Sequence, residues 1–223
     1  MRTWLLVAAE RREFDGVARR AGNVSALVWP GAKFAREIQR NGDRWWMIAN
    51  GPGSALVREA LSGQPARSVQ GIMSTGLCGA LDPALRVGDI VVSGDAPLET
   101  TAKFVRGEIH TVNHVVVAAR DKQLLREKTG AIAVDMEAAA VQEAATEWKL
   151  PYLCVRVVSD EAGDSLPLDF NRYRNARGDF SRTRIALAAM ARPFTVMSQL
   201  MKFDRNCRRA ADALGDFLAH SRF

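Results

Sequence analysis

The chain has 223 residues and a formal net charge of +6, with 48% hydrophobic and 25% charged residues. That length and composition are typical of one globular α/β domain with a sizeable core. No apolar run is long enough to predict a membrane-spanning helix. The one candidate for the apolar part of a secretion signal, Trp4–Ala9, is too short and runs into charged residues, so we expect a cytoplasmic protein.

Cysteine and histidine residues give no sign of a disulfide framework or a metal centre. The three cysteines are far apart and odd in number, and the three histidines form no cluster with ligand spacing. They are Cys78, Cys154 and Cys207, and His110, His114 and His220. We therefore expect a reducing compartment and neither a metal nor an organic cofactor.

The first predicted strand, Trp4–Ala9, is apolar and is expected to be buried on both faces. A helix over Glu10–Arg20 follows it, and Gly22 is a suitable residue to end that helix. Glu10 and Glu13 therefore come just after the carboxyl end of a strand, where open parallel sheets bind ligands. The alternative is that both residues are surface carboxylates that form ion pairs with neighbouring arginines.

A second strand and helix are predicted at Arg44–Ala49 and Ala55–Leu61. The loop between them, Asn50–Ser54, contains glycine and proline and leads directly into the helix. Such a loop can bind an anion at the helix start, and it also fits a plain tight turn.

A third strand is predicted at Val69–Ser74, followed by a glycine-containing turn at Thr75–Ala80, where the backbone could approach a ligand closely. Leu81–Val92 is read as a turn and then a further strand. Beyond it, Ile109–Val117 is strand-like, and Asp121–Lys128 predicts a short charged helix.

Residues 131–160 carry the strongest chemical signal. A short apolar strand ends at Val134, Asp135 fits a helix N-cap, and Met136–Trp148 is rich in helix-forming residues. Glu137 then lies in the first helical turn, where the helix dipole favours an ionised carboxylate. Such a carboxylate can accept hydrogen bonds from two vicinal hydroxyls.

The following apolar strand, Tyr152–Val158, ends in Ser159 and Asp160. A carboxyl group at the mouth of a buried strand can serve as a proton donor. A hydroxyl-binding carboxylate and a proton-donating one are what cleavage of a nucleoside requires, although each alone also fits a helix cap or a turn residue. Arg156 inside this strand needs an acidic partner, either Asp160 or a carboxylate on the neighbouring helix.

Three stretches occur together in the order "DPALRVGDIVV", "VDMEAAAV" and "VRVVSDEA". Through them, residues 1–165 resemble the nucleoside phosphorylase and nucleosidase superfamily. The resemblance implies a three-layer α/β/α fold with a mixed central sheet. It also implies cleavage of a purine–ribose N-glycosidic bond, with adenine as the expected leaving base, and assembly as a homo-oligomer.

The resemblance further implies roles for individual residues. Asp160 would protonate N7 of the leaving base, and Glu137 would bind the ribose 2′ and 3′ hydroxyls. Glu13, or Glu10 as the alternative, would activate water on the opposite face of the sugar. Met136 would lie against the sugar, and the backbone around residues 113–116 would hold the purine. The remaining substrate-binding residues would be Thr75, Gly76, Cys78, Gly79, Val115, Val116 and Ser159.

Two positions depart from the pattern of the superfamily. Leu77 stands where a hydroxyl side chain usually contacts phosphate or the ribosyl region, and leucine cannot donate a hydrogen bond. Hydrolysis is therefore expected rather than phosphorolysis, although phosphate remains a possible partner and Thr75 could compensate. Val115 stands where an aromatic side chain would stack on the base, and an aliphatic face packs there with less specific geometry.

From Leu166 the chain departs from simple nucleosidases. Residues 171–209 contain ten basic and two acidic residues. Apolar runs at Ile185–Met190 and Phe194–Met201 are separated by Arg192-Pro193, and Arg205–Ala219 predicts an amphipathic helix. Nucleic acid is not expected as a partner, because aromatic residues do not interleave with the arginines.

This part of the chain, with the short segment between Val92 and Ala131, resembles phosphorylase-like proteins associated with hopanoid biosynthesis. The matching sequences are "LPLDFNRYRNARGDFSRTRIALAAMARPF" and "RRAADALGDFLAHSRF". The resemblance implies a lipid-linked nucleoside such as adenosylhopane and a peripheral contact with an anionic membrane. The alternative is that the segment completes the core or a subunit interface.

We therefore predict that residues 1–223 form one nucleosidase-like domain with a basic, partly apolar segment at 166–209. One alternative is a phosphorylase acting on soluble purine nucleosides or methylthioadenosine. Another is a catalytically silent nucleoside-binding protein, and a third is a basic nucleic-acid-binding module. The presence of both Glu137 and Asp160 favours an enzyme.

Overall fold

The structure is a computed structural model that describes residues 1–40, 42–62, 69–175, 180, 181, 183–185, 187 and 194–223. Its strands are β1 (Thr3–Ala8), β2 (Val24–Ala26), β3 (Phe34–Arg40), β4 (Asp43–Ala49), β5 (Gly71–Ala80), β6 (Ile90–Gly94), β7 (Glu99–Thr100), β8 (Val105–Arg106), β9 (Ile109–Thr111), β10 (Ala133–Asp135), β11 (Tyr152–Asp160) and β12 (Ser221–Arg222). Its helices are η1 (Arg11–Phe14), α1 (Asp15–Arg20), α2 (Ser54–Leu61), α3 (Ala119–Thr129), α4 (Ala138–Trp148), η3 (Phe170–Tyr173) and α6 (Phe194–Ala219), of which η1 and η3 are 3₁₀ helices.

The main sheet has the strand order β2-β3-β4-β1-β5-β11-β6-β8. Strands β4, β1, β5 and β11 run parallel to one another, whereas β3 and β6 are antiparallel to their neighbours β4 and β11. The short β10 pairs with the end of β5 and with β9. The sheet is therefore mixed, as predicted, and its four central parallel strands end at a common edge, where ligands bind in such sheets.

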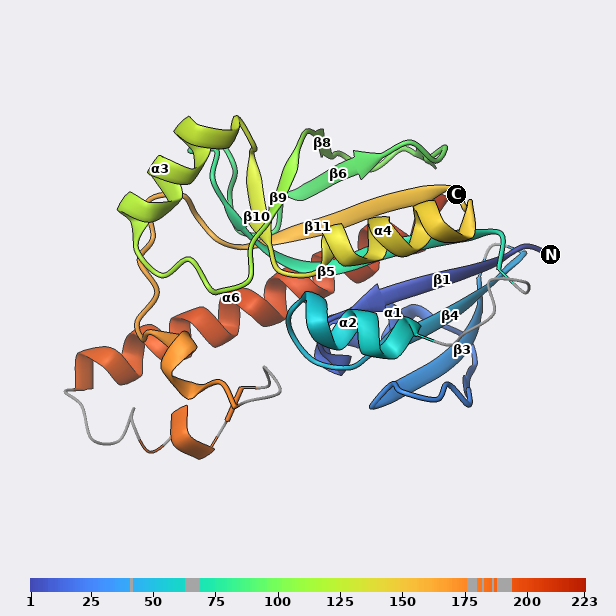
Figure 1. The fold of residues 1–223 in the computed structure, drawn as a ribbon, viewed down its shortest axis with the longest axis horizontal. Helices are drawn as coiled ribbons and strands as arrows, with labels where there is room; N and C mark the ends of the chain where they lie inside the picture. Colours follow the sequence, from blue (N-terminus) through green and yellow to red (C-terminus); the bar gives the residue numbers. More distant parts are fainter. Residues whose placement is uncertain (41, 63–68, 176–179, 182, 186, 188–193) are drawn as a thin grey trace.

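Helices cover both faces of this sheet (Figure 1). One core contains Leu6 of β1 with residues of α1 and α6, and the other contains Leu5 of β1 with residues of α2 and α4. Successive residues of a strand point to opposite faces, so β1 is buried on both sides, as its apolar sequence predicts. The three-layer α/β/α arrangement is confirmed.

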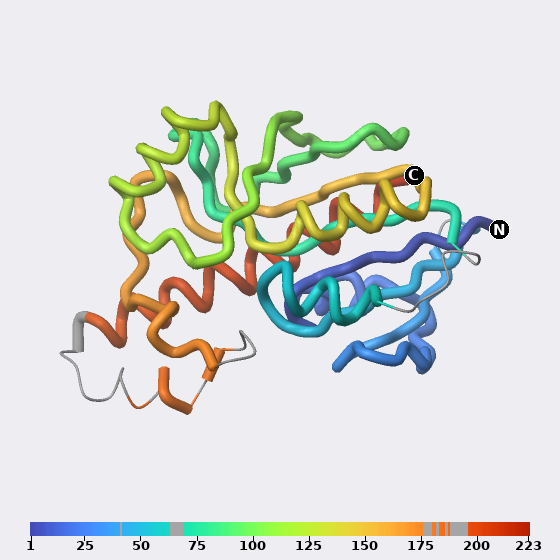
Figure 2. The backbone as a smooth tube through the Cα atoms, in the orientation of Figure 1, coloured from blue at the N-terminus to red at the C-terminus, as the bar shows by residue number. Residues whose placement is uncertain are grey.

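Helix α6 is a continuous helix of 26 residues that crosses one face of the sheet (Figure 2). Its C-terminal part packs on α1, and beyond it Phe223 stacks on Trp45 with ring centroids 5.0 Å apart. Its N-terminal part lies beside η3, where the rings of Phe170 and Phe203 are 5.7 Å apart. Within the described residues, neither α6 nor another helix is long and apolar enough to cross a membrane.

Strand β5 corrects one prediction. Thr75–Ala80 is not a turn but the second half of a ten-residue strand, because β11 pairs with it through Gly79 and β10 takes over at its end. Gly76 has a φ of +131°, and a Cβ atom there would lie 2.6 Å from the Oε1 atom of Glu13. Glycine at this position therefore leaves room for a carboxylate beside the strand.

Other boundaries also differ from the predictions. The helix expected over 10–20 is divided into η1 and α1, and α4 begins at Ala138 rather than at Met136. The strand expected over 109–117 is confined to β9, whereas the helix expected over 205–219 begins earlier, at Phe194. The predicted break at Arg192-Pro193 and most of the apolar run 185–190 lie outside the described residues.

Candidate active site

A cavity of about 710 Å³ opens at the carboxyl ends of β1, β5 and β11, between the start of α4 and the N-terminal half of α6. Its lining includes most of the predicted site residues: Glu13, Cys78, Gly79, Val115, Val116, Met136, Glu137, Ser159 and Asp160. Thr75 and Gly76 are not among the residues that line the cavity, and their contact with a ligand stays a prediction. The Thr75 side chain is fully buried, so it cannot replace the hydroxyl that Leu77 lacks.

Glu13 reaches the cavity from η1 and is 5% exposed. Its two carboxylate oxygens accept hydrogen bonds from the backbone N–H groups of Glu10 and Leu77, both at 2.8 Å. Burial raises the pKa of Glu13 above its ordinary value of 4.5, and the two backbone hydrogen bonds and Arg156 oppose that rise. Glu10, the alternative base, also lines the cavity but forms an ion pair with Arg12 at 2.9 Å.

Glu137 is the N-cap residue of α4 rather than a residue of its first turn. Its Oε1 atom accepts a hydrogen bond of 2.8 Å from the N–H group of Gly53, in the loop before α2. Burial raises the pKa of Glu137, and the charge of Arg156 and the Gly53 hydrogen bond act in the opposite direction. Burial therefore acts against the ionised form of Glu137 that was expected from its place at the helix start.

Asp135 performs the capping predicted for it, because its Oδ2 atom accepts a 2.7 Å hydrogen bond from the N–H group of Ala138. The same carboxylate pairs with Arg156, whose side chain is fully buried. A second carboxylate, Glu137, lies 3.5 Å from the Arg156 guanidinium. The partner of Arg156 is therefore not Asp160 but the two carboxylates at the start of α4, and the arginine fixes Glu137 from behind.

Asp160 ends β11 and is 7% exposed. Its Oδ2 atom accepts a hydrogen bond from the ammonium group of Lys122 on α3, and its Oδ1 atom lies 2.7 Å from the Ser159 hydroxyl. Lys122 is fully buried and also lines the cavity. Lys122 could not be predicted from the sequence, because a lysine among the mostly polar residues of α3 carries no sign of burial.

The loop before α3 was expected to offer its backbone around residues 113–116 to the purine. The Val115 side chain lines the cavity, but its backbone N–H and C=O groups both bond to the side-chain amide of Asn171, at 2.8 and 3.0 Å. Of the backbone expected to hold the purine, the N–H and C=O groups of Val115 are therefore already bonded to the Asn171 side chain.

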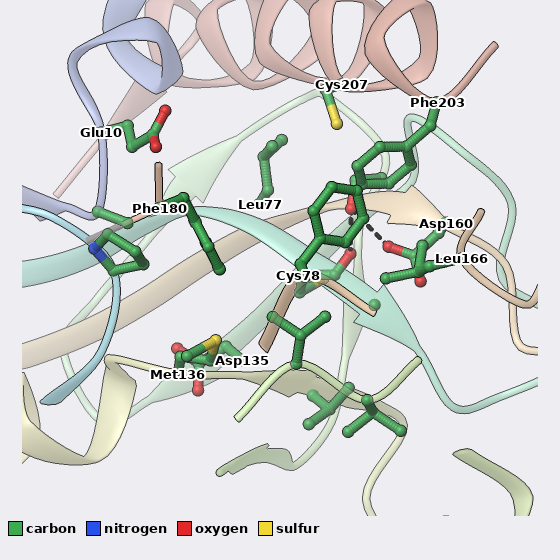
Figure 3. A pocket seen from close by; sticks show the side chains of 18 of the residues that line it. Glu10, Leu77, Cys78, Asp135, Met136, Asp160, Leu166, Phe180, Phe203 and Cys207 are labelled. Atoms are coloured by element: carbon green, nitrogen blue, oxygen red, sulfur yellow. Dashed lines mark hydrogen bonds between the residues drawn. The ribbon is translucent and has the colours of Figure 1, made fainter. Parts of the chain in front are cut away.

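The side of the cavity formed by α6, η3 and the segment before η3 is largely apolar. Figure 3 shows Leu166, Phe203 and Cys207 around the same space as Asp160, with Met136 across from them. Four cavity-lining residues of α6 follow helical spacing, namely Met197, Leu200, Phe203 and Cys207. This spacing can be read from the sequence, and it is the signal that places the four side chains on one face of the helix.

Comparisons with known proteins find sequence relatives for part of the chain. Residues 95–190 match the model of the phosphorylase superfamily. A stretch of 85 residues is 33% identical to the 5′-methylthioadenosine/S-adenosylhomocysteine nucleosidases of Mycobacterium bovis and Mycobacterium tuberculosis, and it covers 35% of this chain and 33% of each relative. The chain thus matches about a third of the length of these relatives.

Solved structures match nearly the whole chain. The 5′-methylthioadenosine/S-adenosylhomocysteine nucleosidase of Neisseria meningitidis has a TM-score of 0.69 at 18% identity, covering 99% of this chain and 98% of that one. A futalosine hydrolase mutant of Helicobacter pylori has a TM-score of 0.68 at 17% identity, covering 98% and 97%. At these identities the likeness shows the fold. The sequence match to the phosphorylase superfamily lies within residues 95–190, and the fold of nearly the whole chain is similar to that of the solved nucleosidases.

Proposed function

We propose that the protein is an enzyme that cleaves the N-glycosidic bond of a purine nucleoside, with adenine as the leaving base. The observation that carries the proposal is that four buried carboxyl groups, Glu13, Asp135, Glu137 and Asp160, line one cavity at the carboxyl ends of parallel strands. Asp135 is engaged by Arg156 and by the start of α4. Buried carboxyl groups cost free energy, so the other three around one cavity favour a chemical role over a structural one.

In the proposed reaction, Glu137 accepts hydrogen bonds from the ribose hydroxyls and Met136 packs against the sugar. Positive charge develops on the sugar as the bond to the base breaks, and Glu137 stabilises it electrostatically. Asp160 faces N7 of the base, which must gain a proton to leave as neutral adenine. Glu13 takes a proton from the water that attacks C1′ on the opposite face.

Hydrolysis rather than phosphorolysis is supported by the surroundings of Glu13. The neighbouring Leu77 contributes an apolar side chain, and its N–H group is already bonded to the Glu13 carboxylate. A phosphate ion at this place would lie beside a like charge and would lack that N–H donor. The guanidinium of Arg12, which also lines the cavity, pairs with Glu10.

We expect the protein to release free adenine from adenine nucleosides at the same rate with and without phosphate, and to leave ribose with a free 1-hydroxyl. Chromatography of the base and of the sugar measures both products. A ribose 1-phosphate product that requires phosphate in the buffer would instead make the protein a phosphorylase. Tight nucleoside binding without release of base would make it a nucleoside-binding protein.

The apolar side of the cavity supports a finer proposal, namely a nucleoside with an apolar 5′ substituent such as the lipid-linked adenosylhopane. Leu166, Met197, Leu200 and Phe203 provide a surface that a polar 5′ group would not need. Exposed basic residues of the same helix, Lys202, Arg205, Arg208 and Arg209, could contact an anionic membrane that holds the substrate.

A 5′ hydrocarbon that buries 100 Å² of apolar surface gains about 2.5 kcal/mol, so we expect kcat/KM to exceed that for adenosine by roughly 70-fold. Leu200→Ser should reduce this ratio, whereas Met201→Ser, at an exposed neighbouring position, should leave it unchanged. Vesicles with anionic lipid should retain the protein at low salt and release it at high salt. Equal efficiency on adenosine and on the apolar substrate would contradict the lipid-linked assignment.

A further inference from the structure

Lys122 is a buried cation in a helix that is otherwise polar and largely exposed. Its side chain is 1% exposed, whereas Lys128 on the same helix is exposed. Burying an ammonium group costs several kcal/mol unless it is paired and hydrogen-bonded. Its partners are the Oδ2 atom of Asp160 and the backbone carbonyl of Glu161, the latter at 2.8 Å. The fold therefore brings a lysine from α3 onto the end of β11 at the place where the cavity meets Asp160.

This pairing changes what Asp160 can do. The Oδ2 atom of Asp160 accepts a hydrogen bond from the ammonium group, so the proton between these two atoms belongs to Lys122. The other oxygen, Oδ1, faces the Ser159 hydroxyl at 2.7 Å, which is also a possible donor. A leaving purine nevertheless needs a proton at N7, so the proton must come from elsewhere in the site.

We propose that Lys122 supplies the proton for the leaving base and that Asp160 relays it. As the C1′–N9 bond breaks, its electron pair goes to the base and N7 becomes more basic. The ammonium group of Lys122 gives its proton to the Asp160 carboxylate, and Asp160 passes that proton on to N7. Lys122 becomes a neutral amine that regains its proton from water after adenine leaves, and Glu13 has taken the proton of the attacking water.

This inference rests on the proposed nucleosidase function and adds to it. It makes Lys122 a positioning residue and a proton reservoir that acts through Asp160. A purely structural ion pair would hold α3 against β11 equally well for every substrate. A proton source matters only when the leaving group has to be protonated, and that difference can be measured.

The first experiment compares Lys122→Met with the wild-type protein on an adenine nucleoside and on p-nitrophenyl β-D-ribofuranoside, whose leaving group departs as an anion. We expect kcat on the adenine nucleoside to fall on the order of 10²–10⁴-fold, with a smaller change in KM. On the nitrophenyl substrate we expect less than about a tenfold change, since no proton transfer is required. Lys128→Met is the matched control on the same helix and should behave as wild type on both substrates.

A second variant separates charge from proton transfer. Lys122→Arg keeps a positive charge beside Asp160, but a guanidinium group does not release its proton in proteins. We expect Lys122→Arg to remain as slow as Lys122→Met on the adenine nucleoside, whereas a structural role would be restored by arginine. If Lys122→Met does not fold, the double variant with Asp160→Asn removes both charges, and its kcat should equal that of Asp160→Asn alone.

The outcomes separate the two proposals. Wild-type release of adenine together with full activity of Lys122→Met or Lys122→Arg would overturn the role of Lys122 and leave the nucleosidase proposal intact. Equal losses of Lys122→Met on both substrates would assign the lysine a structural role. Failure of the wild-type protein to release any base from adenine nucleosides would overturn the nucleosidase function itself.

Discussion

Asp160→Asn is expected to lower kcat for release of adenine on the order of 10²–10⁴-fold, the usual contribution of general acid catalysis. The amide is nearly the same size as the carboxyl group, but it can neither accept a proton from Lys122 nor pass one to N7. Steady-state assays of base release on an adenine nucleoside measure the effect, and thermal denaturation checks that the fold is retained.

The matched control for Asp160→Asn is Asp121→Asn, which neutralises an exposed carboxylate beside Lys122 and outside the cavity lining. That variant should keep the wild-type kcat. Near-normal turnover of Asp160→Asn in a folded protein would remove Asp160 from the reaction and with it the proposed place of the purine.

Glu13→Gln is expected to reduce kcat by a similar factor, on the order of 10²–10⁴, because the attacking water loses its base. Glu13 acts only when ionised, and burial raises its pKa above 4.5. Activity should therefore fall as the pH is lowered through a value above the ordinary pKa of glutamate. The pH profile of kcat/KM for the wild-type protein measures this acid limb.

Two further substitutions serve as controls for Glu13→Gln. Glu147→Gln changes an exposed glutamate of α4 and should have no effect on turnover. Glu10→Gln should cost less than Glu13→Gln, because Glu10 is paired with Arg12 rather than held by two backbone N–H groups. A larger loss for Glu10→Gln would transfer the role of base to Glu10.

The layered fold could be predicted because its signals are local. The apolar run of β1 and the helix-forming residues of α4 identify the elements, and the position of a carboxylate after a strand places it near the sheet edge. Strand and helix positions place Glu13, Glu137 and Asp160 near this edge, and all three line the cavity, whereas the choice of Glu13 over Glu10 came from the resemblance. The end of β5 was misread, because glycines that suggest a turn are here paired on both sides by β11 and β10.

What could not be predicted depends on contacts between distant segments. The partners of Arg156 and of Lys122 lie 21 and 38 residues away along the chain, and nothing local indicates which carboxylate each one meets. The same holds for Asn171, which bonds to the backbone of Val115 across 56 residues. Charges inside a protein are paired by the packing of elements, and that packing is a property of the whole fold.

Helix α6 belongs to two parts of the molecule at once. Its C-terminal half is built into the core with α1, while the residues at 197, 200 and 203 of its other half face the cavity. The carboxyl groups proposed for the reaction stand on other elements, around the ends of β1, β10 and β11. If the proposed reaction holds, substrate range and chemistry are encoded at separate positions, and substitutions at 197, 200 and 203 are expected to change the preferred 5′ group while the proposed catalytic carboxyl groups stay in place.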